Sequence, residues 1–294
     1  MSISLTASYA KCTHVAKTEA RNFYYSFTVL PPEKRAQMCA IYAFMRYSDD
    51  LSDEAALEDG RSNRLSEWRV ALDRAFDGNY GDSDILPAFH DTAVKCNIPK
   101  SLFHELIDGA EMYLDTTRYQ TFEELYTYCY RVASVVGLVC IRVWGYDNQE
   151  AALAPAEACG IAFQLTNILR DVKEDAERGR IYLPLEDLQK FGVSEESLLH
   201  GEVDENFYKL MQFEAARAKD YYEKALPLIP MIDPVSRPTF VVMYRIYRDL
   251  LTEIEKCGYR VFDKRASLPT AKKLWIVAHA WLGSRIRAAG SIRT

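Results

Sequence analysis

Apolar residues recur at three- and four-residue spacing along nearly the whole chain, which is the period of an amphipathic α-helix. Prolines, glycines and capping residues divide this pattern into segments. The helices are predicted at about 7–28, 32–53, 61–77, 84–96, 100–114, 121–144, 149–174, 205–228, 236–257 and 270–289. Residues 185–204 are expected to form a loop with two short helical turns. Because no segment alternates like a strand, one all-α domain is predicted over residues 1–294.

Composition narrows the classes of protein to which the chain can belong. Its 294 residues are 49% hydrophobic, enough for a large core, and its net charge of −6 argues against nucleic-acid binding. No run of 18 apolar residues is present, and neither the first twenty residues nor the tail WLGSRIRAAGSIRT predicts a signal peptide or a membrane anchor. The seven cysteines, without a CxxC pair, predict reduced thiols in a cytoplasmic protein. A peripheral membrane association for product release stays open.

Two acidic motifs carry the chemical signal. Asp49 and Asp53 stand four residues apart, and so do Asp171 and Asp175. On a helix each pair lies on one face, about 5–6 Å apart, where like charges repel. Either motif alone fits the solvated end of a helix equally well. Both, however, follow apolar segments suited to a core, so the sequence predicts two facing carboxylate patches.

Oxygen-rich patches of this kind are typical of Mg²⁺ sites, with Mn²⁺ as the alternative ion, since hard cations take carboxylates together with substrate phosphates. Gln164 and Asn167 extend the second patch along its helix, while Tyr42 and Arg46 extend the first. A guanidinium suits phosphate oxygens, so Arg46, Arg170, Arg178 and Arg180 are candidates for diphosphate binding, with surface salt bridges as the alternative for each. The predicted metal ligands are Asp49, Asp53, Asn167, Asp171 and Asp175.

Three segments, RYSDDLSDE, YCYRVASVVG and above all QLTNILRDVKEDAERGRIYLP, resemble the squalene/phytoene synthase family of head-to-head isoprenyl diphosphate synthases. The resemblance extends from about residue 24 to residue 269. It implies an isoprenoid-synthase-type helical bundle around a central apolar cavity, where two prenyl diphosphates place their head groups at the acidic pairs. The implied reaction is loss of diphosphate from one substrate, attack by the other to give a cyclopropylcarbinyl diphosphate, and in many members a second ionisation.

Individual roles follow from the resemblance. Tyr42 and Arg46 would contact the first diphosphate, and Tyr247 and Arg265 would close over the second. The residues surrounding the second diphosphate would be Gln164, Asn167, Asp171 and Asp175. The aromatic residues of the reacting region would be Phe23, Phe27 and Tyr130. Many members have serines before the first aromatic residue, where this chain has Ala20-Arg-Asn22, so a hydroxyl contact to diphosphate is absent here.

The choice of substrate rests on FYYSFTVLPPEKR and VASVVGLVCIRVWGY, which look most like bacterial presqualene diphosphate or squalene synthases of hopanoid pathways. Farnesyl diphosphate is therefore expected, with NADPH only if the reductive step to squalene is performed. The alternative is a phytoene synthase of carotenoid pathways, acting on geranylgeranyl diphosphate. A non-catalytic assembly factor on the same fold is disfavoured because both acidic pairs are intact. The GRIYLP tail and the DxxxD spacing disfavour a head-to-tail prenyltransferase or a terpene cyclase.

Overall fold

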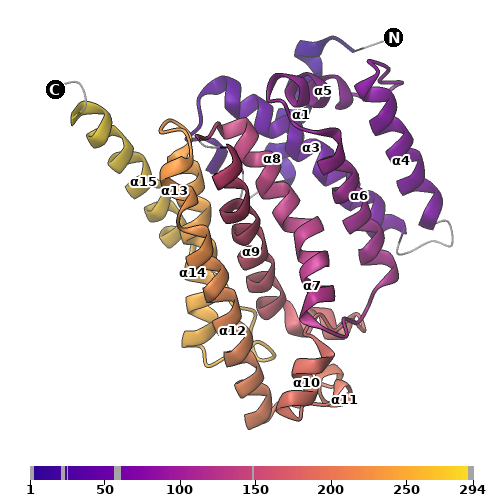
Figure 1. Ribbon diagram of the computed structural model, residues 1–294, viewed down its shortest axis with the longest axis vertical. Helices are drawn as coiled ribbons and strands as arrows, with labels where there is room; N and C mark the ends of the chain where they lie inside the picture. Colours follow the sequence, from indigo (N-terminus) through magenta and orange to yellow (C-terminus); the bar gives the residue numbers. More distant parts are fainter. Residues whose placement is uncertain (1–2, 21–23, 25, 56–60, 148, 291–294) are drawn as a thin grey trace.

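The chain folds as a helical bundle, and helix α9 (Gln149–Glu177) runs through its middle (Figure 1). The computed structural model describes residues 3–20, 24, 26–55, 61–147 and 149–290, with side chains except those of 53–55, 61–63, 149 and 281–290. Within these ranges no strand occurs, and only two isolated β-bridges join loops. The predicted all-α fold is confirmed.

The helices around α9 bury its apolar residues from several sides. They are α7 (Phe122–Cys129), α8 (Val135–Trp144), α12 (Glu205–Ala225), the short α13 (Leu228–Met231) and α14 (Arg237–Lys256). A second group, α1 (Leu5–Glu19), α3 (Pro32–Ala55), α4 (Arg61–Phe76), α5 (Leu86–Lys95) and α6 (Lys100–Asp115), packs against α8 through α3 and α6. Helix α15 (Thr270–Gly290) leaves the bundle beside α14 (Figure 1).

Local capping chemistry explains several boundaries. The Thr121 hydroxyl accepts from the Glu124 amide at 3.3 Å, and Glu124 Oε2 accepts from the Gln120 amide at 2.7 Å, so the predicted start of this helix is confirmed. Asp204 caps α12 in the same way, accepting from the Phe207 amide at 2.9 Å. The predicted loop at 185–204 holds its two short helices, α10 (Leu185–Phe191) and α11 (Glu195–Leu199).

The predicted continuous helix at 7–28 is wrong. Helix α1 ends at Glu19, and Ala20 has φ −81° and ψ 21°, outside the helical region. The backbone is helical again at residues 26 and 27. Ala16 is fully buried on α1, whereas Phe27 and Leu30 are buried farther along the core. The non-helical Ala20 therefore separates α1 from the segment that carries Phe27 and Leu30.

The predicted helix at 121–144 contains a π-helical turn, η1 (Tyr130–Ser134), between α7 and α8. Such a turn inserts one residue into the helix and shifts the side chains that follow it. Gly160 of α9 packs directly on this turn, because a Cβ there would lie 2.3 Å from Ser134 Cα and 2.5 Å from Ser134 N. The backbones of α9 and η1 therefore approach as closely as only glycine allows.

The same segment, Phe122–Trp144, is long and apolar enough to cross a membrane by length and composition. Half of its most hydrophobic window is buried inside the protein. Val132, Val136 and Cys140 of the segment line an internal cavity. Packing against α9 and around this cavity accounts for its apolar composition.

Candidate active site

An internal cavity of about 350 Å³ lies between α3, the η1–α8 segment, α9 and α14. Its apolar wall comes from residues far apart in the sequence and includes the predicted aromatic residue Phe27, which is 3% exposed. The rest of this wall consists of Met38, Ile41, Met45, Val132, Ala133, Val136, Gly137, Cys140, Ile141, Trp144, Ala156, Cys159, Gly160, Phe163, Leu228, Phe240 and Met243. Such a wall suits a hydrocarbon ligand and excludes water.

The polar residues of the cavity come from two helices whose polar faces were predicted separately. Tyr42, Arg46 and Asp49 of α3 line the cavity together with Gln164 and Asn167 of α9. Tyr247 of α14 also lines it, and its ring stacks on Phe163 with the centroids 4.3 Å apart. Helices α3 and α9 therefore both contribute polar side chains to one cavity, with Asp49 as the only member of the two acidic pairs among its described lining residues.

Asp171 lies one turn beyond Asn167 and is held by two arginines. Arg170 donates two hydrogen bonds to its carboxylate, one from Nε to Oδ1 at 2.7 Å and one from Nη2 to Oδ2. Arg265, which precedes α15, brings its Nε to 2.7 Å from the same Oδ1 and 3.2 Å from Glu174 Oε1. Burial works to raise the pKa of Asp171, but the two guanidinium groups hold it below its usual value. Both arginines are thus within reach of an anion bound at Asp171.

Asp175 is in the opposite electrostatic situation. Burial, together with the charge of Asp171 one turn earlier, raises its pKa to about 7. Arg178 and Arg180 act on it only from a distance, and Arg180 is engaged with the Thr116 carbonyl at 3.0 Å. The repulsion predicted for this pair is therefore offset by two arginines at Asp171, whereas at Asp175 it adds to the effect of burial and raises the pKa.

The donor set beside Asp171 fits a hard divalent cation. Asn167 Nδ2 donates to Gln164 Oε1 at 3.3 Å, while Asn167 Oδ1 is buried with no hydrogen-bond partner. Buried acceptors of this kind are rare, and a cation would satisfy this one. Among the described residues no cluster of three His, Cys, Asp or Glu is close enough to bind a metal. A metal here would need the asparagine oxygen and ligands from substrate or water.

The first acidic pair is more open. Asp49 is exposed at the cavity, and Arg46 pairs with Asp50 at 2.5 Å, one turn along the same helix. The Asp53 side chain and the whole of Phe23 lie outside the described residues, so their assigned roles stay predictions.

Tyr130, predicted to line the reacting region, occupies the first position of the π turn and is not among the residues that line the described cavity. Burial raises the pKa of its phenol, and the carboxylates of Glu157 and Glu105 act in the same direction. Its catalytic role stays a prediction.

The end of the cavity away from the acidic pairs is closed by Trp144, the last residue of α8. Its side chain is buried near Phe240, with the ring centroids 6.1 Å apart. Its carbonyl oxygen accepts hydrogen bonds from Lys34 Nζ and from Ser236 Oγ, the latter at 2.7 Å. Lys34 also pairs with Asp233 at 3.1 Å, so α3, α8 and the start of α14 are fastened together here.

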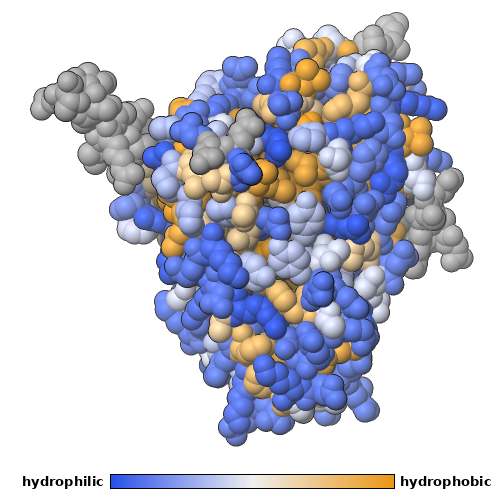
Figure 2. Space-filling model, in the orientation of Figure 1, coloured by the Kyte–Doolittle hydropathy of each residue, from blue (hydrophilic) through white to orange (hydrophobic). Residues whose placement is uncertain are grey.

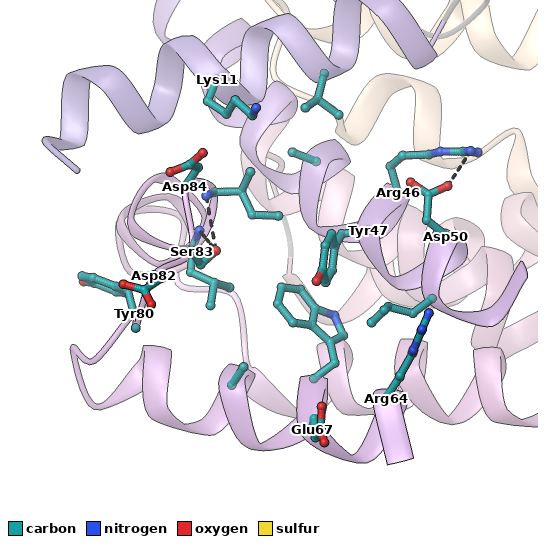
Figure 3. Close-up of a pocket in the computed structure, with 18 of the residues that line it drawn as sticks. Lys11, Arg46, Tyr47, Asp50, Arg64, Glu67, Tyr80, Asp82, Ser83 and Asp84 are labelled. Carbon is teal, nitrogen blue, oxygen red and sulfur yellow. Dashed lines mark hydrogen bonds and ion pairs between the residues drawn. The ribbon is translucent and has the colours of Figure 1, made fainter. Parts of the chain in front are cut away.

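A larger surface hollow of about 940 Å³ lies between α1, α3, α4 and the loop before α5 (Figure 3). Arg46 and Asp50 stand at one edge of this hollow, and Tyr47 packs beside Trp68 with the ring centroids 4.5 Å apart. Charges of both signs surround it, and no described residue of α9 lines it. Because it touches only one of the two acidic helices and lacks a continuous apolar wall, the smaller internal cavity is the better candidate for the chemistry.

Sequence reasoning missed Phe163 and Trp144. Phe163 directly precedes Gln164 and, as an apolar residue on an apolar helix, looked like an ordinary core residue. The signal for Trp144 was weak too, since it stands beside Gly145 at the expected end of its helix.

Comparisons with known proteins agree with this architecture. The squalene/phytoene synthase family model matches residues 16–272. The 15-cis-phytoene synthase of Synechocystis sp. is 40% identical over 295 residues, covering 96% of this chain and 87% of that protein. The phytoene synthase of Mycobacterium tuberculosis is 38% identical, covering 92% of this chain and 89% of that protein.

Solved structures give the same picture. A dehydrosqualene synthase in complex with ligand superposes with a TM-score of 0.86 at 28% identity, covering 97% of this chain and 98% of that one. A squalene synthase from Alicyclobacillus acidocaldarius gives 0.82 at 25% identity, covering 88% and 97%. The family match and these relatives support the class of enzymes that condense prenyl diphosphates head to head. The chain belongs to the squalene/phytoene synthase family, and it is a transferase of that type.

Proposed function

We propose that this enzyme condenses two molecules of geranylgeranyl diphosphate head to head and forms phytoene. The cavity carries the proposal, because Asp49 of α3 and Asn167 of α9 open onto the same apolar space. The relatives named phytoene synthase, at 36–40% identity over most of the chain, favour the twenty-carbon substrate. The farnesyl substrate expected from the sequence is correspondingly the second choice.

The residues at the polar end would bind and orient the diphosphates. Arg170 and Arg265 converge on Asp171, where they can take up the oxygens of a diphosphate as charge develops on it. Arg46 and Tyr42 on the facing helix stand where the other diphosphate would lie. Holding both head groups at one end of a single cavity brings the two reacting carbons together.

The apolar wall would protect the cationic intermediate that remains when diphosphate leaves. Phe27 and the stacked pair Phe163 and Tyr247 present aromatic rings to the cavity, and such faces attract positive charge. The aliphatic side chains keep water away from an intermediate that water would quench. These groups act by position and by excluding water.

The family uses a divalent metal to assist diphosphate ionisation, and we assign Mg²⁺ or Mn²⁺ to this chain. Asp171, Asp175 and Asn167 Oδ1 would hold it on α9, with Asp49 and Asp53 on α3. When bound, the ion neutralises the charge of the departing diphosphate. Phytoene formation needs no reductant, so NADPH is expected to leave the product unchanged.

The test is a product analysis with each substrate. The purified full-length chain is incubated with geranylgeranyl or farnesyl diphosphate, with Mg²⁺, and with or without NADPH, and the extracts are read by mass spectrometry. We expect phytoene from the first substrate, two diphosphates released per product, and no product when EDTA replaces the metal. Longer linear diphosphates as the only products would refute head-to-head condensation.

The second candidate is condensation of two farnesyl diphosphates. The observation in its favour is the closed end of the cavity, where Trp144 is a large side chain that is 2% exposed. Preferential turnover of farnesyl diphosphate, giving presqualene diphosphate or squalene in the same assay, would establish this candidate in place of phytoene formation.

A further inference from the structure

Helix α15 exposes two adjacent large apolar side chains. Leu274 and Trp275 are 52% and 61% exposed, and Ala278 one turn later is exposed as well. The opposite side of the helix faces α14, because Ile276 is 1% exposed and Lys272 pairs with Asp249 of α14 at 3.0 Å. An amphipathic helix normally buries its apolar face. Helix α15 buries Ile276 in this way but leaves Leu274 and Trp275 outside.

These two residues stand out from the other exposed apolar side chains. In the described part of the chain the remaining large examples, such as Val70 and Val94, are not neighbours in the sequence. Isolated exposed apolar residues are ordinary, whereas adjacent ones on a protruding helix indicate a contact surface. Figure 2 shows hydrophobic residues reaching the surface at the left edge, where α15 leaves the bundle.

The charge of this segment identifies the partner. Residues 270–294 hold five of the chain's 36 Lys and Arg and none of its 42 Asp and Glu. The remainder of the chain is therefore strongly acidic and is repelled by an anionic surface, whereas this segment is attracted to one. A second copy of the chain would bring five more cations to the same place, which disfavours self-association through α15.

We propose that α15 is a membrane-surface helix, which lies in the headgroup region of an anionic lipid bilayer with Leu274 and Trp275 inserted. A tryptophan on the apolar face and lysines and arginines along the same helix are the features of interfacial helices. Indole rings prefer this boundary because they are both apolar and able to donate a hydrogen bond. The helix would lie on the bilayer, and it would hold the enzyme where water-insoluble products dissolve.

The experiment is vesicle flotation of the full-length chain without any substrate, so its outcome is independent of the proposed reaction. Vesicles of phosphatidylcholine alone are compared with vesicles that also contain phosphatidylglycerol, at low and at high salt. We expect wild type to float with the anionic vesicles, less so at high salt, because the surface attraction is screened. The Leu274→Glu/Trp275→Glu variant should bind at least about tenfold less.

A matched control places the same charges elsewhere. Val70→Glu/Val94→Glu adds two glutamates at exposed positions on α4 and α5, and it should float like wild type. The conservative Leu274→Ile/Trp275→Phe pair should retain binding, and Ala278→Glu alone should weaken it. Melting temperatures of all variants verify folding.

Wild type remaining unbound to anionic vesicles, or the Leu274→Glu/Trp275→Glu variant floating as well as the control, would overturn the proposal. The proposal would also fail if wild type did not bind vesicles and the Leu274→Glu/Trp275→Glu variant changed from dimer to monomer. That result would show that a second copy of the chain covers this face.

Discussion

The two acidic helices share the DxxxD spacing but differ in their surroundings. On α9, Asp171 is mostly buried and joined to Arg170 and Arg265, so its geometry is fixed before a substrate arrives. On α3, Asp49 is exposed, and Arg46 is occupied by Asp50 of its own helix. A partly buried, cross-linked carboxylate interacts more strongly with nearby charges than one in water. We therefore expect two diphosphate sites of unequal strength, although the spacing of the two acidic pairs is the same.

The first prediction tests this inequality with one substitution on each helix. We expect Asp171→Asn to lower kcat/KM roughly 1,000-fold, since it disrupts the geometry of two arginines at once. Asp49→Asn should lower it roughly 10- to 100-fold. Asp73→Asn, which removes a surface ion pair with Lys100 on α6, serves as the control and should be near wild type. Equal losses from the Asp171 and Asp49 variants would abolish the distinction, and full activity of both would remove the catalytic role assigned to the two carboxylates.

The second prediction concerns what holds α9 in place. Gly160→Ala should lower the free energy of unfolding by about 1–3 kcal/mol, because the new Cβ overlaps the Ser134 backbone. Gly137→Ala should have a smaller effect, since its nearest atom, the Ala156 carbonyl oxygen, would lie 3.2 Å away. Urea unfolding followed by circular dichroism measures both. A Gly160→Ala protein as stable as wild type would mean that α9 can shift, and that the second site is not rigid.

The third prediction separates the polar end of the cavity from its closed end. Trp144→Leu shortens the side chain at the closed end, so the ratio of kcat/KM for the twenty-carbon to the fifteen-carbon substrate should rise about tenfold. Inhibition by inorganic diphosphate, which depends on the polar end, should stay the same. Trp68→Phe, in the other hollow, is the matched control. An unchanged ratio would exclude Trp144 as the residue that limits tail length.

The fourth and smallest effect comes from an acidic cluster that does not line the described cavity. Glu214 is 2% exposed, and it shares Arg217 with Asp187, so two carboxyl groups meet one guanidinium. Burial, and secondarily the carboxylate of Asp187, raises the pKa of Glu214 to about 8. Because this folded-state pKa lies above the unfolded value, the stabilisation is fully present below about pH 4.5 and is lost as pH rises through 8.

Between pH 7 and 9 the unfolding free energy should therefore fall by about 1 kcal/mol in wild type. In Glu214→Gln it should change less, as measured by urea titration at each pH. An identical pH dependence in the two proteins would assign the change to another group.

Sequence patterns that involve only neighbouring residues predicted most of the helices and the polar faces of the two acidic helices. The Thr121 capping box and the four-residue spacing of Asp171 and Asp175 depend on neighbours in sequence, so they could be read directly. The break after Glu19 and the π turn at Tyr130–Ser134 could not, because both arise from how distant segments pack. The fit of Gly160 against Ser134 is likewise visible only when α9 and η1 are placed together.

The same limit applies within the site. Spacing predicted that the charge of Asp171 and Asp175 must be offset, and Arg265 was assigned to the second diphosphate by resemblance. Arg265 and Asp171 are 94 positions apart in the sequence, so their contact could be seen only in the tertiary structure. The same is true of the raised pKa of Asp175. Trp144 was not predicted at the closed end, because an apolar residue at the end of a helix has no local signature of its place in a cavity.

Cys140 and Cys159 both line the cavity wall, and this gives the enzyme a built-in chemical reporter. Burial raises the pKa of Cys140 to about 12 and that of Cys159 well above its usual value, so both remain protonated thiols at neutral pH. Reagents that need a thiolate in water should react slowly with them. An alkylating group carried on an isoprenoid chain would be delivered beside them, so that the extent of labelling would record how deeply a tail of given length enters the cavity.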